Sequence, residues 1–251
     1  MISQQKSQII VGIALISSIA MFFVERIRQD SAYHLFADNR AIDGIPNLVN
    51  VMSNLPFVVV GLLGIRLCLT ANISASLQKS RRPYLVFFLG VMLTGFGSGY
   101  YHLLPDNFTL LWDRMPLAVL SIALFCAVVS DCIHPKIGNR LLLPLIVLAI
   151  SSASYWYYSE LMGAGDLRPY ILIQFLPMLL LPLILWLYDG NRHGCAFVWS
   201  VLGVYVLARI AESLDAEIYR YLRFISGHSI KHLLAGLSTW IVYTALKKRT
   251  A

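Results

Sequence analysis

The stretch Ser226-Gly-His-Ser-Ile-Lys-His-Leu-Leu-Ala-Gly236 opens an apolar run that continues as Leu-Ser-Thr-Trp-Ile-Val-Tyr243. Its apolar length predicts a membrane helix. His228 and His232 are four residues apart, so on a helix both imidazoles lie on one face, one turn apart. Helices use this spacing to give two nitrogen ligands to one metal ion. Interfacial histidines satisfied by water or lipid headgroups would show the same spacing, which alone leaves both interpretations open.

The composition predicts an integral membrane protein. Hydrophobic residues make up 58% of the 251 residues and charged residues 13%, about half the charged share of a soluble domain. The formal net charge of +7 could indicate nucleic acid, but the basic residues lie in short loops and at the C-terminus, so we expect no nucleic-acid partner. The four cysteines lie in or beside apolar segments without CxxC spacing and are interpreted as small core residues.

The hydropathy pattern predicts an all-α, polytopic helix bundle. Ile9–Val24 is interpreted as a retained signal-anchor helix, because the residues that follow offer no small-residue cleavage site. There is no convincing internal repeat. The eight apolar segments, several of them short for a span of about 20 residues, are Ile9–Val24, Asn47–Thr70, Tyr84–Leu103, Pro116–Ile133, Leu141–Tyr158, Tyr170–Tyr188, Cys195–Ala211 and Ser229–Leu246.

Loop charge predicts the orientation of the bundle. With a cytoplasmic N-terminus, eleven basic residues lie on the cytoplasmic side and nine on the other side. This slight majority favours a cytoplasmic location for both termini.

Polar residues from distant segments converge at the opposite, outer end in this topology. Ser98 and His102 share a helix face at the outer end of the third segment, and Asp113 opens the fourth segment after a short hairpin. His228 and His232 open the last segment at the same end, and the asparagines and serine between residues 47 and 54 open the second there. Chance polar residues would scatter over both ends of the bundle, so this convergence favours a site.

Such a cluster suits metal-assisted hydrolysis of an amide or ester. Three neutral imidazoles leave one position of a tetrahedral zinc ion open for water, whose pKa zinc lowers to about 7. Asp113 could take the proton of that water, and Ser98 could hydrogen-bond the developing oxyanion or orient a ligand. Each residue also has a plainer interpretation: Ser98 permits close helix packing, Asp113 pairs with Arg114 or caps a helix, and His102 belongs to an interfacial belt.

The pattern Ser98-x-x-x-His102, Asp113 eleven residues later and a late His228-x-x-x-His232 resembles the alkaline ceramidases, part of a superfamily of seven-helix membrane hydrolases that includes the adiponectin receptors. The Asn-x-x-Ser-Asn element at residues 50–54 resembles the start of the family's first core helix, and the resemblance runs from Asp38 to the C-terminus. It implies two parts, an anchor helix with its connector over 1–37 and a seven-helix catalytic core over 38–251. It also implies zinc ligands at His102, His228 and His232, a water-positioning base at Asp113 and an oxyanion or water partner at Ser98.

The resemblance further implies a calcium site in the acidic segment before the first core helix. Asp38, Asn39, Asp43 and Asn50 retain oxygen ligands there, but Asn47 stands where a glutamate is expected. Fewer carboxylates weaken the binding of a hard dication. An Asx-rich turn that caps the helix explains the same residues.

The expected function is a zinc-dependent amidohydrolase that cleaves the N-acyl amide of ceramide, or of a related lipid, to fatty acid and a sphingoid base. The lipid would reach the site sideways from the bilayer. The alternatives are an ester hydrolase acting on phospholipids or lipid anchors, and a lipid-sensing receptor without catalysis. Arg209, Glu212, Asp215 and Glu217 form a second charged group, interpreted as a structural ion pair between Arg209 and Glu212 or a headgroup contact.

Overall fold

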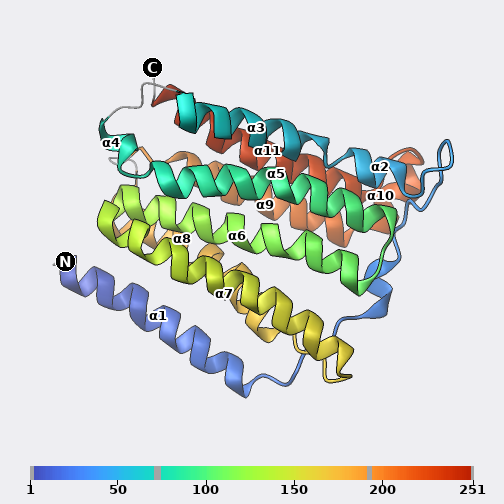
Figure 1. Ribbon diagram of the computed structural model, residues 1–251, viewed down its shortest axis with the longest axis horizontal. Coiled ribbons are helices and arrows are strands. Elements are labelled where there is room, and N and C mark those ends of the chain that lie inside the picture. Colours follow the sequence, from blue (N-terminus) through green and yellow to red (C-terminus); the bar gives the residue numbers. More distant parts are fainter. Residues whose placement is uncertain (1–2, 71–74, 191–193, 250–251) are drawn as a thin grey trace.

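The computed structural model describes residues 3–70, 75–190 and 194–249, whose regular structure is helical apart from one isolated bridge between Ile42 and Ile45 (Figure 1). The helices are α1 (Ser3–Phe23), η1 (Ser31–His34), α2 (Leu48–Met52), α3 (Leu55–Thr70), α4 (Ala75–Gln78), α5 (Arg81–Leu103), α6 (Asn107–Cys132), α7 (Pro135–Leu161), α8 (Arg168–Leu187), α9 (Phe197–Ser213), α10 (Asp215–Leu222) and α11 (Gly227–Lys248).

The prediction of an all-α polytopic bundle is confirmed. In the described part of the chain, six helices are long and apolar enough to cross a membrane, and seven if α9 and α10, bent by 75°, count as one span. Helix α11 is not among them because its first turns carry histidines, serines and a lysine. Its 22 residues are nevertheless about 33 Å long, and it runs along the bundle against α9 and α3 (Figure 1).

Among the differences from the predicted helix boundaries, two lie beside the predicted site. The segment Asn47–Thr70 is divided into α2 and α3 at Ser53 and Asn54. Helix α6 begins well before Pro116 because Asp106 and Thr109 form a capping box, in which the Asp106 carboxylate accepts a hydrogen bond from the Thr109 N–H at 2.7 Å. Asp113 therefore lies in the second turn of α6, and the interpretation that it caps a helix is wrong.

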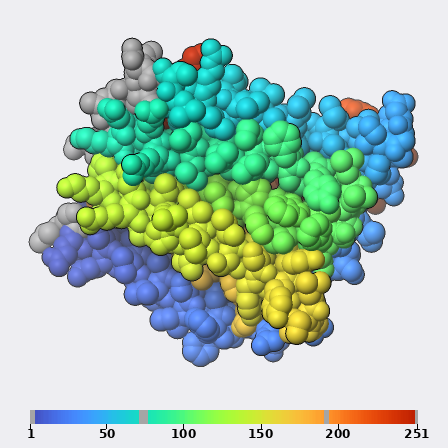
Figure 2. Space-filling model, in the orientation of Figure 1, coloured from blue at the N-terminus to red at the C-terminus, as the bar shows by residue number. Residues whose placement is uncertain are grey.

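Helix α1 occupies one edge of the bundle (Figures 1 and 2). Only 6% of its apolar window is buried, and its main neighbour is α8. A hydrogen bond of 2.8 Å joins the hydroxyls of Ser7 and Tyr188, and the Lys6 ammonium lies 5.3 Å from the Tyr188 ring. An apolar cavity of about 360 Å³ is lined by residues of α1, α6, α7 and α8.

The connector between α1 and α2, residues 24–47, crosses the end of the bundle opposite both chain termini (Figure 1). The Leu167 N–H donates to the Ile27 carbonyl at 2.8 Å, and the Ala37 N–H donates to the Asp215 carboxylate at 3.0 Å. The connector thus joins α1 to the start of α8 and to α10. Further bonds along it come from Arg168 to the Val24 carbonyl, from the Gln29 N–H to Glu160 and from Arg40 to the Phe224 carbonyl.

A buried ion pair closes the end of the bundle that holds the termini. The Arg249 guanidinium donates to the Asp131 carboxylate at 2.6 Å, and the side chain of Asp131 is 3% exposed. Tyr84 donates to the same carboxylate at 2.9 Å, and Ser80 also donates to it. These contacts fix the last turn of α11 to the end of α6.

Candidate metal centre

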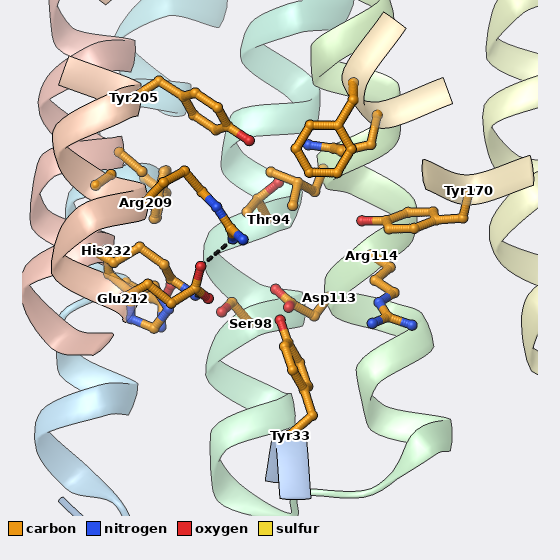
Figure 3. Close-up of a pocket in the computed structure, with 18 of the residues that line it drawn as sticks. Tyr33, Thr94, Ser98, Asp113, Arg114, Tyr170, Tyr205, Arg209, Glu212 and His232 are labelled. Atoms are coloured by element: carbon orange, nitrogen blue, oxygen red, sulfur yellow. Dashed lines mark hydrogen bonds and ion pairs between the residues drawn. The ribbon is translucent and has the colours of Figure 1, made fainter. Parts of the chain in front are cut away.

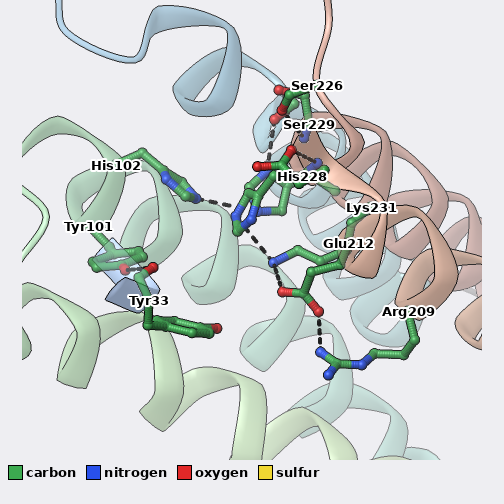
Figure 4. Close-up of polar contacts among 12 residues, drawn as sticks. Tyr33, Tyr101, His102, Arg209, Glu212, Ser226, His228, Ser229 and Lys231 are labelled. Atoms are coloured by element: carbon green, nitrogen blue, oxygen red, sulfur yellow. Dashed lines mark hydrogen bonds and ion pairs between the residues drawn. The ribbon is translucent and has the colours of Figure 1, made fainter. Parts of the chain in front are cut away.

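Three histidines meet inside the end of the bundle opposite the chain termini, and Figure 4 labels two of them, His102 and His228. His102 comes from the last turn of α5, and His228 and His232 come from the first two turns of α11. One potential ligand nitrogen of each lies within 4.8 Å of the others, and within the described ranges no other group of three or more His, Cys, Asp or Glu side chains does this. All three are buried, and His102 Nε2 faces His232 Nε2 at 3.4 Å.

The loop between α10 and α11 sets the position of His228. Ser226 caps α11 by accepting a hydrogen bond from the Ser229 N–H at 3.3 Å, and Asp215 accepts one from the His228 N–H at 2.7 Å. A Cβ atom on Gly227 would lie 2.1 Å from the Ala211 carbonyl oxygen. Glycine therefore allows the start of α11 to pack against the end of α9.

Ser53 orients the ring of His232. Its hydroxyl donates to the Asn50 carbonyl at 2.7 Å, so its oxygen accepts a hydrogen bond from His232 Nδ1–H at 2.8 Å. This tautomer leaves the lone pair of Nε2 directed at the other two histidines. The sequence placed Ser53 at the correct end of the bundle but did not reveal this role.

Two asparagines, one in α2 and one at its N-cap, bond to the helix turns that carry the histidines. Asn47 Nδ2 donates to the His102 carbonyl at 2.9 Å, and Asn50 Oδ1 accepts a hydrogen bond from Ser229 at 2.6 Å. Asn50 is fully buried. Within the Asn-x-x-Ser-Asn element, Asn50 therefore bonds to the first turn of α11 and Ser53 bonds directly to His232.

Phe36 of the connector covers one side of the histidines. Its ring centroid lies 4.6 Å from that of His102 and 5.0 Å from that of His228. It is 9% exposed and separates the centre from the outer surface. This contact could not be predicted from the pattern of residues, because Phe36 lies in a loop without periodicity.

Ser98 and Asp113 face each other beside the histidines (Figure 3). They lie on adjacent helices, α5 and α6, which approach closely at Gly97: a Cβ atom there would lie 2.1 Å from the Trp112 carbonyl oxygen. Both side chains line a cavity of about 250 Å³ that His232 also lines. Three of the five predicted site residues thus line one cavity, and the other two, His102 and His228, lie beside His232.

A charged cluster lines the same cavity. Glu212 on α9 pairs with Arg209, as the sequence predicted, and also with Lys231 of α11 at 2.9 Å (Figure 4). The Lys231 Nζ lies 3.2 Å from His228 Nε2. Sequence reasoning missed Lys231, although its place between His228 and His232 was visible. It also missed that this cluster adjoins Asp113.

The residues considered for calcium have other partners. Both carboxylate oxygens of Asp38 accept hydrogen bonds of 2.7 Å from Arg40. Asn50 Nδ2 donates to the Asp38 carbonyl at 3.1 Å, whereas Asn39 and Asp43 are exposed. A calcium ion could use Asp38 only after Arg40 had left it.

The histidine set fits a metal ion of the zinc type. Imidazole nitrogens suit zinc, copper, iron and nickel, and the contact with Ser53 favours the His232 tautomer that a ligand needs. The three histidines lie beside the Asp113 carboxylate, inside a bundle of helices long and apolar enough to cross a membrane. This combination is expected of an intramembrane hydrolase.

A family model described as Ceramidase matches residues 40–206, which are 167 of the 251 residues, and the chain belongs to this family. The matched range includes Ser98, His102 and Asp113 and ends before His228 and His232. No curated protein matches the chain.

Proposed function

We propose that this protein is a membrane-embedded, zinc-dependent amidohydrolase that releases fatty acid and a sphingoid base from ceramide or a related N-acyl lipid. The observation that carries the proposal is the convergence of His102, His228 and His232 in a Ceramidase-family chain, next to a cavity that His232 and Asp113 line. The three histidines would hold the ion. When bound, zinc supplies Lewis-acid activation of water at neutral pH.

Asp113 and Ser98 have distinct roles in the proposed reaction. Asp113 accepts the proton of the attacking water while the water oxygen bonds to the amide carbon. Ser98 donates a hydrogen bond to the carbonyl oxygen as negative charge develops on it. Asp113 then gives its proton to the amide nitrogen, and the carbon–nitrogen bond breaks to leave a carboxylic acid and an amine.

The lipid would reach the cavity from the bilayer. Helices α8 and α9 touch at few positions, and the cavity lies between them, lined by Ile171 and Phe175 on one side and Tyr205 and Ala208 on the other. We propose that residues 38–251 form the catalytic core and residues 1–37 an anchor with its connector. Both termini would be cytoplasmic, with the site near the opposite face.

The metal assignment can be tested on the full chain purified in detergent. Wild-type protein should contain about one zinc ion per chain, and His228→Ala and His232→Ala should each lose it. His134→Asn is the matched control, because His134 is exposed at the start of α7 and asparagine keeps the cap. Full zinc retention in both site variants would exclude these ligands.

The reaction can be tested by incubating the protein with ceramides, phospholipids and simple acyl amides. Fatty-acid release from ceramide or another acyl amide supports the proposal, whereas release only from esters indicates an esterase. Zinc binding without release from any lipid favours a lipid-sensing receptor. Asp113→Asn should bind zinc and lose turnover; unchanged turnover would remove Asp113 from the base role.

A further inference from the structure

The cavity beside the metal centre carries more positive than negative groups. Five of its lining residues are charged: Asp113, Arg114, Arg209, Glu212 and Lys231. They comprise three cations and two carboxylates. Charged groups at membrane depth are costly, so their balance indicates what the cavity is built to bind.

Glu212 already has two cationic partners and cannot neutralise a third. Arg209 and Lys231 both pair with its carboxylate, Lys231 at 2.9 Å. Asp113 faces Ser98 (Figure 3). Neither carboxylate is paired with Arg114 among the ion pairs of the described residues.

Arg114 is held in place by neutral groups. It is 7% exposed, its Nη2 donates to Gln29 Oε1 at 2.6 Å, and its guanidinium lies 4.1 Å from the centre of the Trp156 ring. Tyr170 and Tyr33 lie 5.1 and 5.6 Å away. Its buried Nη1 has no hydrogen-bond partner within the described structure. A buried charged donor without an acceptor is unfavourable, and a ligand that supplies an anionic oxygen would remove this cost.

We propose that Arg114 is a specificity-determining residue that binds an anionic group of the substrate, so that the site prefers N-acyl lipids with an anionic head over neutral ones. The inference rests on the proposed function. The anionic group belongs to the amine part of the lipid, because the acyl part is a hydrocarbon chain. Arg114 and Asp113 line the same cavity, which places the anion near the amide that is cleaved.

Two matched substrate pairs test this preference in a neutral detergent. The first is N-palmitoylglycine and N-palmitoylethanolamine, which differ mainly by a carboxylate, and the second is ceramide 1-phosphate and ceramide. Wild-type kcat/KM should favour the anionic member of at least one pair by about 10- to 100-fold, mainly through KM. A preference within the first pair would identify a carboxylate as the anionic group, and a preference within the second pair would identify a phosphate. Equal rates within both pairs would overturn the inference.

Three variants separate charge from packing. Arg114→Gln should abolish the preference, whereas Arg114→Lys, which keeps the charge but loses the stacking on Trp156, should retain part of it. Arg140→Gln changes the net charge equally at an exposed position outside the cavity and should leave the preference intact. If Arg114→Gln keeps the preference for anionic lipids, or if Arg114→Gln and Arg114→Lys lose it equally, the role of Arg114 is structural. If Arg114→Gln does not fold, the wild-type comparison decides alone.

A binding measurement distinguishes this inference from the hydrolase proposal. N-palmitoylglycine should raise the Tm of the wild-type protein more than N-palmitoylethanolamine does, and Arg114→Gln should remove the difference. If no lipid is hydrolysed but this difference is present, the hydrolase proposal fails and the anion site stands. If lipids are hydrolysed but neither kcat/KM nor Tm differs between the anionic and neutral lipids, the hydrolase proposal stands and the anion site is refuted.

Discussion

The close approach of α5 and α6 at Gly97 provides a sharp test of the site geometry. In Gly97→Ala, the new Cβ would lie 2.1 Å from the Trp112 carbonyl oxygen. Because this neighbour is backbone, it cannot rotate away. Restoring an ordinary contact of 3.4 Å requires about 1.3 Å of separation between the helices. Overpacking of this kind costs about 1–3 kcal/mol.

The separation would act directly on Ser98 and Asp113, which flank the two sides of this contact. A displacement of about 1 Å in catalytic groups can lower the rate by about 100-fold. We therefore expect Gly97→Ala to lose about two orders of magnitude in fatty-acid release and to lower the Tm. Zinc content should be measured on the same preparation. A loss of zinc would indicate that the proposed ligand His102, also on α5, has moved, whereas a full zinc content would attribute the lower rate to Ser98 and Asp113.

Gly99→Ala is the matched control on the same helix. A Cβ atom at Gly99 would meet nothing within 4 Å, so this substitution should stabilise α5 by up to about 1 kcal/mol through helix propensity alone. Wild-type turnover and Tm in Gly97→Ala would refute the importance of this close approach. Equal damage in both variants would attribute the effect to α5 as a whole.

Three further perturbations have defined outcomes. Ser53→Ala should weaken zinc binding by about 10- to 100-fold in a competition titration, because His232 loses the partner that orients it; unchanged affinity would contradict that role. Arg249→Ala should lower the unfolding free energy by about 3 kcal/mol, because Asp131 is left buried without its cation, and a full zinc content would show that the centre is unaffected. Burial opposes ionisation of Asp38, but hydrogen bonds from Arg40 outweigh it and hold the pKa of Asp38 below its usual value. The stability that ionised Asp38 adds to the folded state is fully present above its unfolded pKa of about 3.9, and it is lost as the pH falls through the lower folded pKa. The Tm of Asp38→Asn should accordingly lie below that of wild type at pH 7, with a gap that narrows in acid; a gap independent of pH would refute this origin.

Much of the fold was predictable because lipid-facing helices must be apolar over a fixed length. Every predicted apolar segment corresponds to a helix or a pair of helices in the described structure. Spacing also predicted the site, since Ser98 with His102 and His228 with His232 each share a helix face, and the topology then brings them to one end.

The remainder depends on contacts between distant parts of the chain. The capping box at Asp106 lies in a polar hairpin outside the apolar pattern, which is why the start of α6 was placed too late. The amphipathic helix α10 is too short to give a clear periodic signal. The contacts of Phe36 with His102 and of Arg114 with Trp156 join segments whose separation in sequence carries no information about their proximity.

The connector has a consequence for synthesis of the protein. It is made early, yet Ala37 and Arg40 find their partners at Asp215 and Phe224, and Ser53 finds His232 on the last helix. While a ribosome is still producing α11, Ser53 has no histidine partner and the histidine set is incomplete. Assembly of the histidine set is therefore a late event, and a prematurely terminated chain that lacks α11 would contain only one of the three histidines.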